Sequence, residues 1–217
     1  MFSDLNMALQ KISDNNKCNY VRTFCMPTSL RNNFERIEDK SYELLTKDEY
    51  FDSNKIGGFI CSAFINSNII KANHLRFDEN MSILEDQVFS INAALYSPEI
   101  LIFNQKNYYY YSNVLSLTNE KKDRGSDIIK CINQVVLLAQ INPSVSVERF
   151  VNERFLPVKY SMYIRNKVYC LIQNIRKGVF SISLNDLELL EEHVNLSKVH
   201  LNLKDKCCFF LLKLFSL

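Results

Sequence analysis

The chain has 217 residues, of which 47% are hydrophobic and 23% are charged, so it is long enough and apolar enough to bury a core. Its 26 basic and 24 acidic residues leave a formal net charge of +2, which excludes a general electrostatic attraction to nucleic acid. The seven cysteines have irregular spacings and form no Cys-x-x-Cys pair, which favours a reducing, cytoplasmic setting over a disulfide framework.

The first part of the chain predicts a short helix, a strand and a polar excursion. Apolar residues at helical spacing predict an amphipathic helix over residues 3–13, and we expect no secretion signal there. Residues 19–25 are rich in β-forming side chains and predict a strand that ends before Pro27. Residues 28–52 are mostly polar and predict a surface excursion with a short helix near residues 42–45.

Residues 57–116 predict a mixed α/β region. We expect helices over residues 62–73 and 85–96, the second with Val88, Phe89, Ile91 and Leu95 on its buried face. The apolar run at residues 100–103 predicts a buried strand. The four tyrosines at residues 108–111 predict another strand, after an Asn-Gln-Lys-Asn turn.

After Gly125 the pattern becomes helical, so we expect a partial α/β region over residues 1–120 and a helical subdomain over residues 125–217. The basic run at residues 121–125 is interpreted as a solvated loop at the boundary. Pro157 and Gly178 are expected to break the helical pattern. The expected helices cover residues 127–140, 145–155, 160–175, 186–193 and 204–215.

The most informative stretch is residues 75–89, in which a charged segment and a polar turn lead into a helix that opens with Glu85 and Asp86. On local grounds the pair is structural. Ser82 and Glu85 have the spacing of a capping box, and acids in the first turn complement the helix dipole. The alternative is that Asp86, about 100° further round the helix than Glu85, faces a cleft and carries out chemistry.

The order of the expected segments from about Cys61 to Ser116, with the Glu-Asp pair among them, resembles the acceptor side of family-2 glycosyltransferases of the GT-A fold. In that family the aspartate of the Glu-Asp pair is the general base that deprotonates the acceptor hydroxyl. The resemblance implies an incomplete GT-A-like acceptor half of mixed α/β class, followed by a mainly α-helical region. It implies Asp86 as the catalytic base, and acceptor-binding roles for Glu85, Arg76, Asp78, Ser62, Tyr110 and Tyr111.

The sequence also departs from the family. Cys61-Ser62-Ala63 stands where Trp-Asn-Lys is frequent, and Ser112 stands where an arginine often lies. No Asp-x-Asp element is present, although its carboxylates hold Mg²⁺ or Mn²⁺ against the sugar-nucleotide diphosphate in the family. We therefore expect no cofactor in this chain, and metal with nucleotide-sugar only in a complete enzyme. A truncated reading frame, a split enzyme and a non-catalytic remnant all fit this pattern.

Other features are less specific. His74, His193 and His200 have no metal-ligand spacing, so we expect no metal site. Cys61 is interpreted as a small buried residue rather than a nucleophile. The apolar residues 207–217 are too few to span a bilayer, and two interpretations stay open for them. They form a peripheral contact with the inner face of a membrane, or they pack on the helical subdomain or a dimer partner.

The sequence thus predicts the acceptor-binding portion of an inverting glycosyltransferase in surface polysaccharide biosynthesis, cytoplasmic and inactive alone. The expected partners are a glycan acceptor and a separate nucleotide-binding half or a second copy of the chain, without nucleic acid. The alternative is a catalytically silent helical interaction or assembly module derived from such an enzyme. In that case the Glu-Asp pair only caps a helix.

Overall fold

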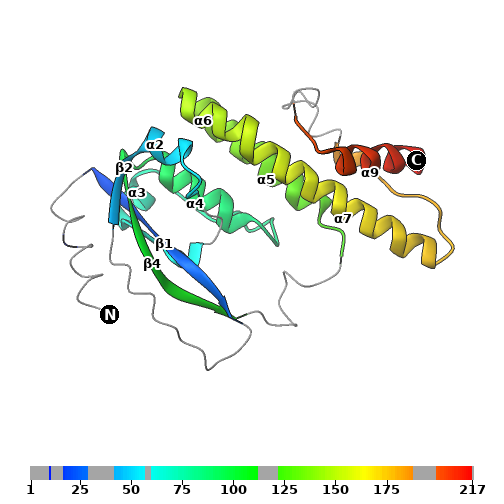
Figure 1. Ribbon diagram of the computed structural model, residues 1–217, viewed down its shortest axis with the longest axis horizontal. Helices are drawn as coiled ribbons and strands as arrows, with labels where there is room; N and C mark the ends of the chain where they lie inside the picture. Colours follow the sequence, from blue (N-terminus) through cyan, green and yellow to red (C-terminus); the bar gives the residue numbers. More distant parts are fainter. Residues whose placement is uncertain are drawn as a thin grey trace. The chain divides into compact units, whose positions relative to one another are not determined.

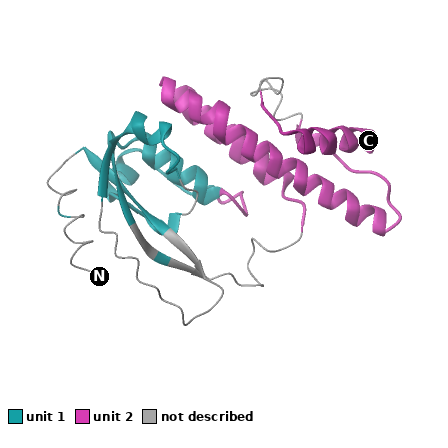
Figure 2. Cartoon of the chain, viewed as in Figure 1, with its two compact units in different colours: residues 1–78, 85–119 teal, residues 79–84, 120–217 magenta. Residues whose placement is uncertain are grey.

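The computed structural model (Figure 1) describes residue 10 and residues 17–28, 42–56, 60–111, 122–187 and 199–216. Contacts within the chain divide it into two units (Figure 2). Unit 1 comprises residues 1–78 and 85–119, and unit 2 comprises residues 79–84 and 120–217. The six residues just before Glu85 therefore belong to unit 2. The expected division into an acceptor-binding region over residues 1–120 and a helical subdomain over residues 125–217 stays a prediction.

Unit 1 contains a four-stranded sheet with the order β2-β4-β1-β3. In its centre β1 (Cys18–Thr28) runs parallel to β4 (Glu99–Tyr111). At the edges β2 (Tyr42–Thr46) is antiparallel to β4, and β3 (Ala63–Ile65) is antiparallel to β1. The apolar run at residues 100–103 is buried in β4, as expected for a central strand.

β4 is a single strand of 13 residues, so the turn expected at residues 104–107 is wrong. The register explains how polar residues are accommodated there. Arg22 pairs with Ile102, whereas Phe24 pairs with Lys106, so β4 has extra residues opposite one residue of β1. An irregularity of this kind admits unpaired residues without ending the strand.

The helix expected near residues 42–45 is also wrong, because Tyr42–Thr46 forms β2. Helix α2 (Lys47–Asp52) begins directly after it with a capping box. The Thr46 hydroxyl accepts from the Glu49 amide at 3.3 Å, and the Glu49 carboxylate accepts from the Thr46 amide at 2.8 Å. The spacing Thr-x-x-Glu was readable in the sequence as a helix start.

The single helix expected over residues 62–73 consists of three short elements. A 3₁₀ turn (Ile60–Ser62) leads into β3, and α3 (Ser67–Ala72) follows. Asn66 separates the last two, since its side-chain oxygen accepts from the Asn68 amide at 2.9 Å and caps α3.

Helix α4 (Glu85–Leu95) confirms the helix expected over residues 85–96. All four residues assigned to its inner face are buried. The Tyr20 hydroxyl of β1 hydrogen-bonds the Ser90 hydroxyl at 2.6 Å, and the ring of Phe77 stacks on Phe89 with centroids 4.2 Å apart. These contacts hold α4 against β1 and against the segment around Phe77 within unit 1.

Unit 2 is helical, with α5 (Gly125–Ile141), α6 (Val145–Arg149), α7 (Leu156–Arg176) and α9 (Leu203–Leu214). The break expected at Pro157 is wrong, because a π-helical stretch (Phe150–Phe155) joins α6 directly to α7. Pro157 lies in the first turn of α7, where its missing N–H and fixed φ are tolerated. α7 contacts both α5 and α9.

Two expected helices fall wholly or partly outside the described residues. Only Gln10 is described in the helix expected over residues 3–13. Of the helix expected over residues 186–193, only residues 186 and 187 are described, and they belong to a 3₁₀ turn (Asn185–Leu187). Among the helices that are described, none combines the length and the apolar character needed to cross a membrane.

Candidate functional site

The segment that precedes the Glu-Asp pair is fixed by side chains of unit 2. Ser82 donates to Asp127 Oδ2 from its amide at 3.2 Å and from its hydroxyl at 2.6 Å. The Arg124 guanidinium donates to the same hydroxyl oxygen at 2.6 Å, and Lys130 Nζ donates to the Asn80 carbonyl at 2.9 Å. Arg124 is buried, so the interpretation of residues 121–125 as a solvated loop is wrong for this side chain.

The capping box expected between Ser82 and Glu85 is not formed. Helix α4 begins at Glu85, and the Ser82 amide and hydroxyl that would serve the box are directed to Asp127. Leu84, immediately before the helix, has a φ of 69° in the left-handed region. This conformation costs a branched residue about 1–2 kcal/mol, and such strain is frequent at functional sites.

Glu85 and Asp86 both lie in the first turn of α4 and are half-buried. The side chain of Asp86 is therefore neither enclosed in the core nor fully exposed, and it takes part in an interaction within the chain. Glu85 differs, because its Oε2 atom is buried and accepts no hydrogen bond from the described residues. A buried oxygen of this kind is unusual in a folded protein and needs an explanation.

Three of the residues expected to bind an acceptor lie on segments that touch α4. Phe77 stacks on Phe89 of α4, which places its neighbours Arg76, exposed, and Asp78, half-buried, on a segment along this helix. The 3₁₀ turn that ends in Ser62 also contacts α4. The structure thus gathers these segments in unit 1 around the helix that begins with Glu85 and Asp86.

Ser62 and its neighbour Cys61 differ in exposure. Ser62 is buried, and its carbonyl accepts from the Thr23 hydroxyl of β1 at 3.0 Å. This arrangement favours a supporting role for Ser62, and direct acceptor binding by it stays a prediction. Cys61 is exposed, so the expectation of a buried cysteine at this position is wrong.

Tyr110 and Tyr111 lie at the end of β4, where their backbones pair with Pro27 and Thr28 of β1. Their side chains fall outside the described residues, so their proposed contact with a sugar stays a prediction. In the part of the chain that the structure describes, no group of three or more histidine, cysteine or acidic side chains could hold a metal ion.

Unit 2 contains a second polar cluster, which the sequence did not reveal. The buried Lys167 Nζ forms ion pairs with Asp123 at 2.9 Å and Asp186 at 3.0 Å, and the Tyr163 hydroxyl donates to Asp186 at 2.8 Å. Burial lowers the pKa of Lys167, but the two carboxylates outweigh it and leave the pKa above its ordinary value. These groups satisfy one another, which indicates a structural role.

Comparisons with known proteins show a likeness of fold. No protein-family model matches the chain, and no curated protein matches it. Among solved structures, the chain is similar to the crystal structure of S. aureus TarS 1-349 in complex with UDP, with 13% sequence identity and a TM-score of 0.50. The match covers 82% of this chain and 54% of that one. The chain therefore has a mixed α/β, glycosyltransferase-like fold and spans about half the length of the TarS structure.

Proposed function

We propose that this chain is the acceptor-binding part of an inverting glycosyltransferase and that Asp86 is its general base. The observation that carries the proposal is the position of Asp86, half-buried in the first turn of α4, within a fold similar to that of a glycosyltransferase. Leu84, with its left-handed backbone, lies immediately before this turn and adds support.

The proposed reaction is a direct displacement at the anomeric carbon of the donor sugar. The Asp86 carboxylate takes the proton from an acceptor hydroxyl while that oxygen forms the new glycosidic bond and the nucleoside diphosphate departs. Attack on the face opposite the leaving group inverts the anomeric configuration. A positioned base of this kind contributes typically about 10²–10⁴-fold to the rate.

The other proposed roles follow from exposure and charge. The Oε2 atom of Glu85, which accepts no hydrogen bond from the described residues, would accept one from a second hydroxyl of the acceptor sugar. That bond would remove the cost of burying this oxygen. Arg76 and Asp78 supply further polar contacts from the segment beside α4. Tyr110 and Tyr111 remain candidates for the wall that stacks on the sugar.

The donor side of the reaction is proposed to come from elsewhere. The sequence contains no Asp-x-Asp element, so we assign the nucleotide-sugar and its Mg²⁺ or Mn²⁺ to a separate nucleotide-binding half or to an assembly of several copies. The chain alone would transfer no sugar. We place it on the cytoplasmic side of the membrane, where it would extend a surface glycan.

Genetic complementation tests the role of Asp86 in the intact system. The gene is deleted in its source organism and replaced by the wild type, by Asp86→Asn or by Asp48→Asn. Asp48 is an exposed acid in the first turn of α2 and serves as the matched control. Wild type and Asp48→Asn should restore the surface glycan, whereas Asp86→Asn should restore about one hundredth of it or less.

Full restoration of the surface glycan by Asp86→Asn would show that Asp86 is not the general base. Loss of the glycan on deletion, together with full restoration by Asp86→Asn, would instead favour a silent assembly module derived from a glycosyltransferase. That alternative has one observation in its favour, namely the large apolar side chains that α9 exposes. Binding of the purified chain to a glycan array further distinguishes the acceptor-binding protein from the assembly module. Only the acceptor-binding proposal expects Glu85→Gln to weaken glycan binding.

A further inference from the structure

Helix α9 has an inner face that packs on α7. Leu212 and Asp205 are buried on this face, and the ring of Phe209 meets Tyr160 of α7 edge-on at 5.8 Å. Asp205 accepts from the Ser161 hydroxyl at 2.6 Å, which fixes the first turn of α9 on the same helix. The packing expected for the end of the chain is therefore present on one side of α9.

The opposite side of α9 is an apolar stripe that none of the described residues covers. Leu203, Cys207, Phe210 and Leu214 recur at spacings of four, three and four residues, so they share one side of the helix. Their exposure is large, at 78% for Leu203, 64% for Phe210 and 63% for Leu214. Leu211, 51% exposed, widens the stripe on one side. We refer to these five residues as the outer stripe.

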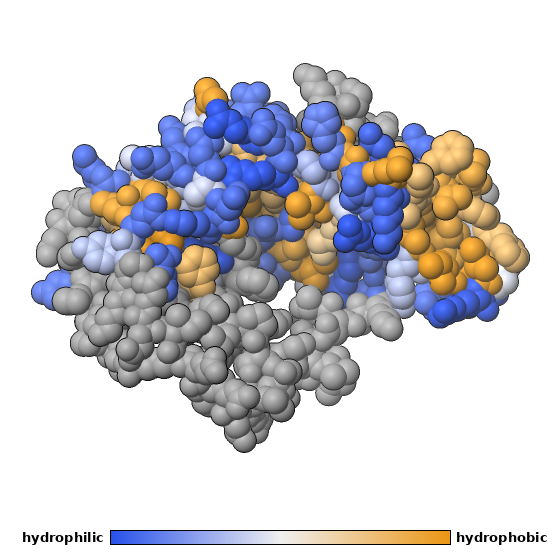
Figure 3. Space-filling model, viewed as in Figure 1, coloured by the Kyte–Doolittle hydropathy of each residue, from blue (hydrophilic) through white to orange (hydrophobic). Residues whose placement is uncertain are grey.

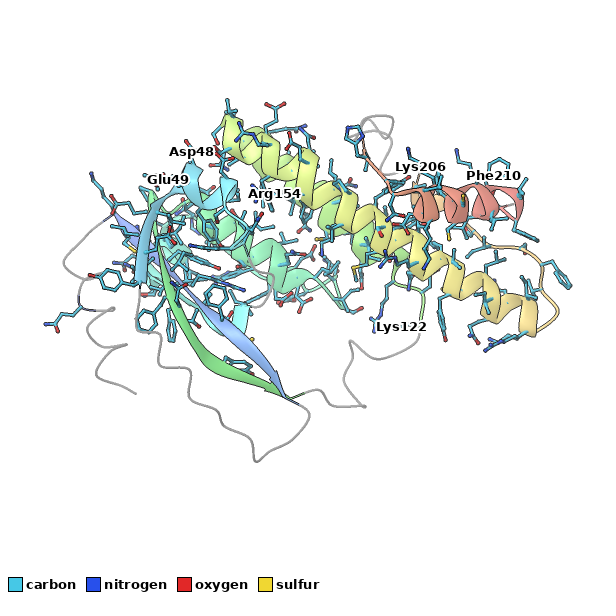
Figure 4. The ribbon with its side chains drawn as sticks, viewed as in Figure 1. Asp48, Glu49, Lys122, Arg154, Lys206 and Phe210 are labelled. Atoms are coloured by element: carbon cyan, nitrogen blue, oxygen red, sulfur yellow. The ribbon has the colours of Figure 1, made fainter. Side chains whose placement is uncertain are left out.

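Lysines flank the outer stripe on both sides. At 100° per residue, Lys206 and Lys213 lie along one edge and Lys204 lies near the other. All three are exposed. Figure 4 shows Lys206 and Phe210 projecting from the side of α9 that faces away from α7. The only acidic residue of α9 is Asp205, which is buried on the inner face and hydrogen-bonded.

The surface next to the end of α9 also exposes apolar and basic side chains. The backbone of Ile182 donates to the Phe215 carbonyl at 3.0 Å, so the segment after α7 runs beside the end of α9. This segment and the last turns of α7 expose Ile172, Ile175, Val179 and Phe180, together with basic Arg176 and Lys177. Figure 3 shows hydrophobic atoms gathered at this end of unit 2.

We propose that the outer stripe of α9 binds the surface of a membrane that contains anionic lipids, with the helix lying in the plane of the interface. Apolar side chains on such a helix enter the boundary between headgroups and acyl chains. Lysines at the edges extend their alkyl stems beside the apolar side chains and place their ammonium groups among lipid phosphates. This arrangement needs no membrane-spanning segment and does not depend on the proposed base.

Charge argues against a second copy of the chain as the occupant. Two outer stripes that paired would bring Lys204, Lys206 and Lys213 of both copies together, and α9 offers no exposed acid to neutralise them. Like charges at close range oppose such pairing, whereas anionic headgroups attract all three lysines.

A tryptophan reporter tests the proposal directly, because the chain has no tryptophan of its own. Phe210→Trp places a single fluorophore in the outer stripe, and Leu137→Trp places one on α5, where Leu137 is 55% exposed. With vesicles of phosphatidylcholine and phosphatidylglycerol, the emission of Phe210→Trp should shift to the blue and be quenched by brominated acyl chains. Leu137→Trp should show neither change. An unshifted Phe210→Trp would overturn the proposal.

Vesicle cosedimentation then separates the apolar and the charged contributions. Phe210→Ser with Leu214→Ser should weaken binding at least about tenfold. Lys206→Gln with Lys213→Gln should weaken it by about fivefold for each lysine, and only on anionic vesicles. The control is Leu137→Ser with Ile141→Ser, two exposed residues of α5 that should leave binding unchanged.

The alternative occupants give different results in the same experiments. Equal binding to neutral and anionic vesicles would contradict the role of the lysines. If the chain is a dimer that Phe210→Ser with Leu214→Ser converts to a monomer, and no vesicle binding is found, the outer stripe is an interface between copies. All variants change exposed side chains, and an unchanged circular dichroism spectrum verifies that each remains folded.

Discussion

Asp127 accepts two hydrogen bonds from Ser82 through a single carboxylate oxygen, one from the amide at 3.2 Å and one from the hydroxyl at 2.6 Å. The hydroxyl oxygen in turn accepts from Arg124 at 2.6 Å. Asp127 and Arg124 are both buried, whereas Ser82 is exposed, so the network joins a surface residue to two buried charged side chains. It fixes the short segment that ends just before Glu85 and Asp86.

Removing the Ser82 hydroxyl should destabilise unit 2 measurably. Ser82→Ala leaves Arg124 without this acceptor and Asp127 with one donor fewer, and a buried group that loses its partner costs about 1–3 kcal/mol. The control is Ser126→Ala, an exposed position in the first turn of α5, which should change stability by less than about 0.5 kcal/mol. Urea denaturation followed by circular dichroism measures both, and equal midpoints would contradict this role for Ser82.

The same network shows why the sequence placed α4 correctly but predicted a capping box that is not formed. The apolar spacing of Val88, Phe89, Ile91 and Leu95 is a local signal, and it predicted the helix and its buried face. The partner of Ser82 is 45 residues further along the chain, and no local pattern identifies it. Tertiary contacts therefore replaced a capping box that was plausible on spacing alone.

Two other errors in the predicted elements also have identifiable physical causes. Pro157 was expected to end a helix, but a π-helical stretch precedes it and the helix continues through it as α7. The strand Tyr42–Thr46 was taken for a helix because its pairing partner, β4, lies far away in sequence. The first turn that carries Glu85 and Asp86 was predicted from sequence, but the unpartnered Oε2 of Glu85 becomes visible only in three dimensions.

Gly125→Ala should destabilise unit 2, although alanine is the better helix former by about 1 kcal/mol. A Cβ at this position would lie within 3.0 Å of Asp186 Oδ2 and of the end of the Lys167 side chain. Neither can move freely, because Lys167 and Asp186 form an ion pair at 3.0 Å and Tyr163 holds Asp186. The net loss should be about 1–3 kcal/mol, and a gain in thermal stability would contradict the close packing at Gly125.

A double-mutant cycle isolates the cause of that loss. In an Asp186→Ala background the nearest obstacle to the new Cβ is gone and Lys167 keeps only Asp123 as its ion-pair partner in this cluster, so the loss caused by Gly125→Ala should shrink. A loss that persists unchanged in this background would show that contact with Asp186 is not its cause.

Asp205 should make unit 2 sensitive to acid. The residue lines a cavity of about 510 Å³ between α7 and the start of α9. Burial raises the pKa of Asp205, but hydrogen bonds from Ser161 and Asn202 and the nearby Arg165 outweigh it, so the pKa lies below its ordinary value of 3.8. The stability from Asp205 is therefore present above the unfolded pKa and is lost as the pH falls through the folded pKa.

The comparison of wild type with Asp205→Asn tests the direction of this pH dependence of stability. The difference between their urea midpoints should be constant from about pH 7 to about pH 5 and should narrow below about pH 4. A difference that stays constant or widens on acidification would show that Asp205 is not a stabilising carboxylate.

Two glutamates in first turns should respond in opposite directions to the same substitution. Glu49 of α2 closes a capping box with Thr46, and the hydrogen bonds from the Thr46 amide and hydroxyl lower the pKa of its carboxyl. Glu85 of α4 has a buried oxygen that accepts no hydrogen bond from the described residues. Figure 4 marks Glu49 at the start of α2. Glu49→Met should therefore lower the urea midpoint.

Glu85→Met should raise the urea midpoint. Removing a buried oxygen without a partner recovers about 1–3 kcal/mol, whereas losing the interaction with the helix dipole costs only about 0.3–1 kcal/mol. The gain of about 1 kcal/mol should be accompanied by weaker glycan binding, because a costly buried acid is retained when function needs it. If Glu85→Met destabilises the protein as Glu49→Met does, Glu85 is an ordinary structural acid, and its place in the acceptor site has to be given up.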